Sequence, residues 1–188
     1  MSTVIAIVGV PGTGKSTLMK QFLENWMWEE HKPVDLLDGY LARDEGIFVM
    51  GKYEEGEVFS GTDRLSMAVQ PKAIEYLEGD PADTVVFEGD RLTTVSFFQA
   101  VKAAGHKLVI VELTVPDDLR EQRYVDRGSD QSEQFIQSRF TKLKNIKNEF
   151  GPNLFDDGNI TTFEHKDQKD TNDVLTFIGE YVRLNHSQ

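Results

Sequence analysis

The chain has 188 residues, enough for one domain with a sizeable hydrophobic core. Hydrophobic residues make up 39% and charged residues 28%, which indicates a globular protein and not a disordered one. The absence of cysteine excludes disulfides, thiolate–zinc sites and a cysteine nucleophile. A formal net charge of −12 disfavours a general nucleic-acid coat or an anionic membrane surface as partner, although it leaves room for a local basic site.

Apolar, β-branched runs alternate with helical patterns, which predicts a three-layer α/β fold in which helices flank a five-stranded parallel sheet. The predicted strands span residues 3–8, 34–37, 84–88, 108–115 and 160–163. The predicted helices span residues 16–30, 64–77, 94–104, 116–127, 133–147 and 171–184. Residues 38–62 show no clear period and carry five glycines, which predicts a long functional loop.

A single domain over residues 1–188 is the simplest organisation, since no repeat, linker or low-complexity tract interrupts the pattern. The first ten residues carry no basic region and only a short apolar run, so we expect a strand there and not a signal peptide. No run approaches the ~18 apolar residues that a membrane span needs. Together with the lack of cysteine, these features predict a cytoplasmic protein without a membrane partner.

Residues 9–17, GVPGTGKST, follow the first predicted strand and open the first predicted helix. They match G-x-x-x-x-G-K-[ST], a loop whose backbone N–H groups surround a phosphate with help from the helix N-terminus. We expect Lys15 to reach the β- and γ-phosphates, and the Ser16 hydroxyl to bind Mg²⁺. The alternative, a glycine-rich turn without a ligand, is made rare by the strand before it and the helix after it. The predicted nucleotide-binding residues are Gly9, Pro11, Gly12, Thr13, Gly14, Lys15, Ser16 and Thr17.

Two carboxylates end predicted strands, where ligands gather in open parallel sheets. Glu88 closes the third strand beside the phosphate loop, a position from which it holds Mg²⁺ directly or through water. Asp38 follows the second strand, and a carboxylate there accepts or orients the proton of an acceptor hydroxyl during phosphoryl transfer. The alternative for Asp38 is an Asp-Gly turn without a catalytic role.

Arginines gather in residues 117–147, which predict a helix–turn–helix after the fourth strand. Arg120, Arg123 and Arg127 are spaced by three and four residues, so one helical face presents them. Such a face spreads positive charge over the oxygens of a transferring phosphoryl group, and we predict Arg123 and Arg127 as catalytic. The alternative is surface pairing with neighbouring acids on a mixed-charge helix.

Several of these segments resemble known P-loop kinases. LLDGY is similar to the acceptor-facing strand end of adenylyl-sulfate and gluconate kinases, and residues 117–147 resemble the lid of nucleoside-monophosphate and gluconate kinases. VVFEGDRL resembles the thymidylate kinase group, although Leu92 stands where that group has tyrosine. Over nearly the whole chain, order and length resemble a nucleotide-kinase-type P-loop phosphotransferase. The resemblance implies ATP and Mg²⁺ as cofactors, an adenine site between the last strand and last helix, and an acceptor-binding insertion at about 38–82.

Side chains in the insertion and after the third strand are candidates for binding a nucleotide-type acceptor, because an arginine clamps phosphate and an aromatic ring stacks on a base. The alternatives are packing under a loop for the aromatic residues, and helix capping for the aspartates. The predicted acceptor-binding residues are Tyr53, Phe59, Asp63, Arg64, Asp90 and Arg91.

FSGTDRLSMAVQP and FEGDRL look like phage-encoded kinases of the thymidylate kinase superfamily that phosphorylate 5-hydroxymethyl-deoxyuridine within DNA. This resemblance implies modified DNA as partner, and the host cytoplasm as location if the chain is phage-encoded. Arg139, Lys142, Lys144 and Lys147 form a run that suits a nucleic-acid backbone or, alternatively, a solvated helix face. A kinase of a free nucleotide or small hydroxylated metabolite, and a P-loop switch NTPase, remain open as alternatives.

Overall fold

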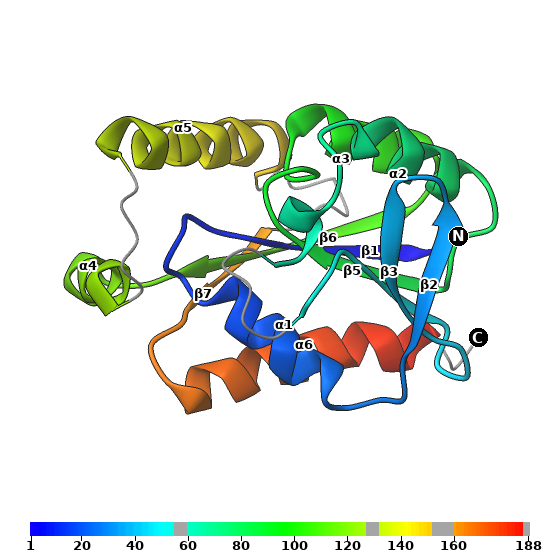
Figure 1. The fold of residues 1–188 in the computed structure, drawn as a ribbon, viewed down its shortest axis with the longest axis horizontal. Coiled ribbons are helices and arrows are strands. Elements are labelled where there is room, and N and C mark those ends of the chain that lie inside the picture. The colour runs from blue at the N-terminus through cyan, green and yellow to red at the C-terminus, as the bar shows by residue number, and fades with distance from the viewer. Residues whose placement is uncertain (55–59, 127–131, 152–159, 186–188) are drawn as a thin grey trace.

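The central sheet has seven strands in the order β2-β3-β4-β5-β1-β6-β7 (Figure 1). The computed structural model describes residues 1–54, 60–126, 132–151 and 160–185. Strands β4, β5, β1, β6 and β7 run parallel, whereas β2 and β3 add an antiparallel hairpin at one edge. The strands are β1 (Thr3–Val8), β2 (Glu29–Val34), β3 (Leu37–Ala42), β4 (Ile47–Met50), β5 (Thr84–Glu88), β6 (Lys107–Thr114) and β7 (Ile160–Glu164).

Helices cover both faces of the sheet, with α1 and α6 on one and α2, α3 and α5 on the other. Strand β1 shows how the sequence produces these layers, because its side chains alternate between faces. Val4, Ala6 and Val8 pack in one apolar cluster, while Ile5 and Ile7 pack in the other. The helices are α1 (Lys15–Leu23), the short 3₁₀ helix η1 (Thr62–Arg64), α2 (Val69–Glu78), α3 (Val95–Ala103), α4 (Asp117–Asp126), α5 (Glu133–Phe150) and α6 (Gln168–Asn185).

The α/β class and the mostly parallel, helix-flanked sheet are confirmed, but the prediction of five strands is wrong. The helix predicted over residues 16–30 ends at Leu23, and Glu29–Val34 forms β2. Its sequence EEHKPV lacks an apolar run because it is an edge strand with exposed and half-buried side chains. The strand predicted over residues 34–37 is also wrong, since Asp35 and Leu36 form the turn between β2 and β3.

The loop predicted over residues 38–62 contains β3 and β4 in its first half. Gly39 indicates close strand approach here, because a Cβ atom at this position would lie 2.2 Å from the carbonyl oxygen of Val49. Gly39 pairs with Met50, the last residue of β4, so the start of antiparallel β3 lies at the carboxyl edge of the parallel strands. Asp38 therefore stays at the edge where ligands gather, although it lies near the start of β3 and does not follow the end of a strand.

The remaining helices lie close to their predicted positions. The helix predicted over residues 64–77 divides into η1 and α2, and Pro71 falls in the first turn of α2, where its missing N–H costs little. Helix α3 is capped by Thr94, whose hydroxyl accepts the N–H of Phe97 at 3.1 Å. Within the described residues, no helix combines the length and apolar character needed to cross a bilayer.

Candidate active site

The P-loop connects β1 to α1, which begins at Lys15 with Gly14 as its left-handed N-cap. The Lys15 ammonium donates to the carbonyl oxygens of Gly9 at 2.8 Å and Val10 at 3.2 Å. The Thr13 hydroxyl also donates to Val10, at 3.0 Å. The lysine therefore lies folded along its own loop, next to the positive end of α1, where a phosphate chain finds several donors.

Glu88 lies beside this loop because β5 pairs with β1 in a register that places Glu88 opposite Ile7. Glu88 is 2% exposed, and its carboxylate accepts hydrogen bonds from Ser16 at 3.1 Å and Ser60 at 3.3 Å. Its pKa is raised to about 7, mainly by burial; the Lys15 ammonium opposes this rise, and the charge of Asp63 adds to it. A serine hydroxyl beside a carboxylate is an oxygen pair that suits Mg²⁺. The two predicted metal ligands thus lie in contact.

The segment before α2 packs directly against the end of β5. The Thr62 hydroxyl donates to the backbone carbonyl of Glu88 at 2.9 Å. The N–H of Asp90 donates to Asp63 Oδ1 at 2.7 Å, and Arg91 Nε lies 3.5 Å from the carbonyl of Leu65. The two sequence motifs that resemble phage DNA kinases therefore form one contact surface, next to the predicted metal ligands.

Asp90 forms an ion-pair cluster with helix α5. Arg139 lies 2.5 Å from one carboxylate oxygen and Lys142 lies 2.7 Å from the other. Lys147, further along the same basic run, pairs at 2.7 Å with Glu112, whose side chain is 5% exposed. Three cations of the run thus have acidic partners within the protein, and these ion pairs compete with contact to a nucleic-acid backbone.

The Tyr53 hydroxyl is buried and, within the described part of the chain, donates no hydrogen bond, although the Glu88 backbone contacts its oxygen. Burial raises the pKa of Tyr53 well above its ordinary value, and the charges of Glu88 and Asp63 raise it further. The phenol is therefore a neutral donor close to the two carboxylates at the centre of the site. Arg64, also predicted to bind the acceptor, pairs with Glu54 at 3.1 Å.

Asp38 lies in a separate cavity, next to the β2–β3 hairpin. Its carboxylate pairs with Lys52 at 3.4 Å and lines a cavity of about 290 Å³ with residues of β2, β3 and the segment after β4. Asp63, in contrast, is close enough to Glu88 for its charge to raise the pKa of that residue. Of these two predicted carboxylates, the structure brings Asp63 and not Asp38 beside the two predicted metal ligands.

Arg123 projects from α4 to the P-loop, where it donates to the carbonyl oxygen of Gly12 at 3.0 Å. Its guanidinium also donates to the carbonyl oxygens of His165 at 3.3 Å and Lys166 at 3.1 Å. Two further predicted site residues, Arg127 and Phe59, lie outside the described residues.

A cavity of about 350 Å³ opens beside the P-loop, between the start of α1 and the segment linking β7 to α6. Gly14, Thr17, Arg123 and residues 165–168 line it. The sequence predicted an adenine site in this segment without naming residues. His165 is the side chain that the prediction missed, and its only sequence signal is its position directly after a strand.

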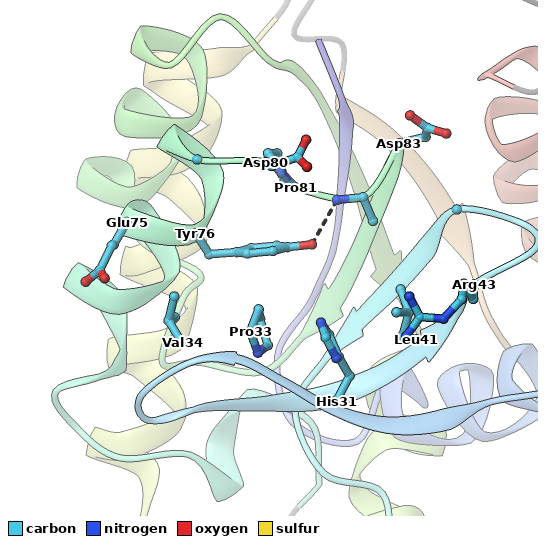
Figure 2. A pocket seen from close by; sticks show the side chains of 13 residues that line it. His31, Pro33, Val34, Leu41, Arg43, Glu75, Tyr76, Asp80, Pro81 and Asp83 are labelled. Carbon is cyan, nitrogen blue, oxygen red and sulfur yellow. Dashed lines mark hydrogen bonds between the residues drawn. The ribbon is translucent and has the colours of Figure 1, made fainter.

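A larger cavity, of about 610 Å³, lies at the opposite edge of the sheet (Figure 2). It is lined by Gly46 and Asp83, which precede β4 and β5, and by Tyr76, whose hydroxyl accepts the N–H of Ala82 at 2.9 Å. No P-loop residue lines this cavity. Its size therefore gives no reason to place the phosphate chemistry there.

Comparisons with known proteins identify the family to which the chain belongs. The sequence model of the family P-loop Nucleotide Kinase3 matches residues 1–169, whereas no curated protein matches the chain. Solved structures with a similar fold include an unliganded sugar kinase from Janibacter sp. HTCC2649, with 13% identity and a TM-score of 0.49 over 95% of each chain, a similarity too low to bear on function. The family match includes the P-loop, Glu88 and the arginine-bearing helix α4, and the chain belongs to the P-loop Nucleotide Kinase3 family.

Proposed function

We propose that the protein is an ATP- and Mg²⁺-dependent kinase that transfers the γ-phosphoryl group to a hydroxyl of a nucleotide-type acceptor. One observation carries the proposal: the P-loop, the contacting pair Ser16 and Glu88, and the carboxylate of Asp63 converge at one edge of the sheet. A phosphate cradle, a place for a divalent cation and a candidate base are the parts that phosphoryl transfer needs.

On the donor side, the triphosphate is bound by the P-loop amides and by Lys15, which exchanges its carbonyl partners for phosphate oxygens. Ser16 and Glu88 would hold Mg²⁺, which neutralises charge on the phosphate oxygens when bound. The cavity of about 350 Å³ beside Gly14 and Thr17 receives the adenine of ATP. Its volume lies within the range of small-molecule sites.

On the acceptor side, we assign Asp63 the task of accepting or orienting the proton of the attacking hydroxyl. The N–H of Asp90 holds Asp63 Oδ1 at 2.7 Å and so fixes the direction of the whole carboxylate. The Tyr53 hydroxyl, a buried donor close to the same carboxylates, gains a partner when the acceptor binds. Arg64, Arg91 and Asp38 contact the acceptor further from the reacting oxygen.

We propose 5-hydroxymethyluracil within DNA as the first acceptor to test. The support is the packing of residues 60–65 against residues 88–91, since these segments carry the two motifs that resemble the phage DNA kinases. The base would have to leave the stack to reach Asp63. The net charge of −12 and the internal pairing of Arg139 and Lys142 weigh toward the alternative acceptor, a free nucleotide.

The experiment offers γ-labelled ATP and Mg²⁺ with DNA that contains 5-hydroxymethyluracil, with matched thymine DNA, and with free deoxynucleotides. Label that enters the hydroxymethyluracil DNA and not the thymine DNA supports the specific acceptor. Label found only in free nucleotides overturns the DNA acceptor and keeps the kinase. Label that enters no acceptor contradicts the proposed function.

A further inference from the structure

Three consecutive carbonyl groups of the P-loop accept hydrogen bonds from side chains outside it. The Tyr124 hydroxyl donates to Pro11 at 2.8 Å, and Arg123 Nη1 donates to Gly12 at 3.0 Å. His165 Nδ1 lies 2.8 Å from the carbonyl oxygen of Thr13. Because a carbonyl only accepts, the imidazole carries its proton on Nδ1 and donates. These three side chains are called the outer clamp below.

The clamp fixes the direction of three amides. In a trans peptide the C=O and the following N–H point to opposite sides of the chain, and the described peptide bonds are all trans. Holding the carbonyls of Pro11, Gly12 and Thr13 therefore turns the N–H groups of Gly12, Thr13 and Gly14 away from the clamp. An anion is bound by N–H groups and repelled by carbonyl oxygens, so the side opposite the clamp is the phosphate side.

The glycine positions agree with this geometry. A Cβ atom on Gly12 would lie 2.9 Å from the Tyr124 ring, and one on Gly14 would lie 2.4 Å from His165 Nδ1. Both glycines also have positive φ angles, of 82° and 89°. The rings of Tyr124 and His165 thus pack directly against the backbone of Gly12 and Gly14. A side chain at either glycine would collide with the clamp.

The clamp also joins three elements. Tyr124 and Arg123 come from α4, which has no buried residue of its own, so polar contacts and not a core hold this helix on the P-loop. His165 follows β7, and its Nε2 lies 2.7 Å from the Thr171 hydroxyl in α6. Arg123 closes the arrangement by donating to the His165 carbonyl at 3.3 Å.

We propose that Tyr124, Arg123 and His165 are positioning residues that orient the P-loop amides toward the triphosphate before it binds. The proposal rests on the proposed function, in that the loop binds ATP. Arg123 then acts through the backbone of the loop. Tight ATP binding requires that α4 stays docked against the P-loop. Movement of α4 away from the loop lowers that affinity.

The test measures MgATP affinity by calorimetry in variants that change one donor each. Tyr124→Phe keeps the ring and removes one hydrogen bond, so we expect about three- to tenfold weaker binding with an unchanged melting temperature. His165→Leu is expected to weaken binding by a similar factor, whereas His165→Asn restores it because the asparagine amide N–H occupies the position of Nδ1–H. Tyr76→Phe, in the cavity at the opposite edge, is the matched control and keeps full affinity.

Amide ¹⁵N–¹H resonances of Gly12 and Gly14 in the ATP-free protein give a second readout. They shift in Tyr124→Phe and His165→Leu, and stay in place in Tyr76→Phe. Wild-type affinity for MgATP in both Tyr124→Phe and His165→Leu overturns the clamp and leaves the kinase proposal intact. A wild-type protein that binds no MgATP overturns the proposed function itself. If His165→Leu fails to fold, Tyr124→Phe and His165→Asn decide the question.

Discussion

The donor and acceptor sides of the site are held in different ways. On the donor side, Lys15, Arg123 and Tyr124 donate to backbone carbonyls of the P-loop, so its shape is set before any ligand arrives. On the acceptor side, charged side chains hold one another: Asp90 with Arg139 and Lys142, and Arg64 with Glu54.

This difference indicates which existing contacts each substrate has to replace when it binds. ATP finds a loop whose amides are already oriented, and the Lys15 ammonium and the Ser16 hydroxyl change partners when MgATP binds. The acceptor finds cations that already have carboxylate partners, and it must replace or share them. Substitutions on the donor side should therefore lower turnover and ATP affinity, whereas those on the acceptor side should change the Michaelis constant for the acceptor.

The largest expected effect is that of Lys15→Ala. Removing the ammonium takes away charge stabilisation of the transferring group, so phosphoryl transfer should fall by about 10²- to 10³-fold in a labelled-phosphate assay. Lys20→Ala, at an exposed position of the same helix, is the control and should keep wild-type activity. A near-normal rate for Lys15→Ala would mean that the loop does not cradle the reacting phosphates.

The next prediction separates the two candidate bases. Asp63→Asn should lower kcat by about 10²-fold or more, with ATP affinity unchanged, because it removes the proton acceptor beside Glu88. Asp38→Asn should change kcat less and the acceptor KM more, since its carboxylate pairs with Lys52 in a separate cavity. If Asp38→Asn lowers kcat more than Asp63→Asn does, Asp38 and not Asp63 is the catalytic base.

Glu88 lies between the two sides and gives the protein a pH-dependent stability. Its pKa is about 7 in the fold against an ordinary 4.5, so the folded state favours the protonated form. The contribution of protonated Glu88 to the free energy of unfolding is therefore complete below pH 4.5. It is lost as pH rises toward and through 7, and the total loss is about 3 kcal/mol in Mg²⁺-free buffer.

Glu88→Gln should abolish that loss. The free energy of unfolding of the variant, measured in urea, should therefore rise relative to that of wild type between pH 4.5 and 8. Glu75→Gln, at an exposed position of α2, is the control. A difference between Glu88→Gln and wild type that does not vary with pH would show that the carboxylate is not buried as described.

The smallest effect expected is that of Arg139→Gln on stability. Its ion pair with Asp90 is partly exposed, with 26% and 27% of the two side chains accessible, and Lys142 remains as a second partner. Unfolding should change by less than about 1 kcal/mol, while the acceptor KM changes in kinetic assays. A large loss of stability would mean that the acceptor side is as rigid as the P-loop.

The donor side was predictable from sequence because its spacing is local. Nine consecutive residues specify the P-loop, and Glu88 follows from a strand end next to β1. The hairpin of β2 and β3 was not predictable, since EEHKPV is a polar edge strand and Gly39 marks strand contact where a glycine usually indicates a loop. His165, Tyr124 and the Asp63 contact with Asp90 depend on tertiary packing between segments far apart in the sequence.

The central claim is that this edge of the sheet passes the terminal phosphate of ATP to another molecule. Its most direct test is the rate of ADP formation by the wild-type protein with and without acceptor, at saturating MgATP. We predict slow ADP formation alone, a large increase on addition of a competent acceptor, and one phosphate incorporated per ADP released. ADP formed equally fast with no acceptor present would contradict the account and indicate an NTPase that uses hydrolysis as a switch.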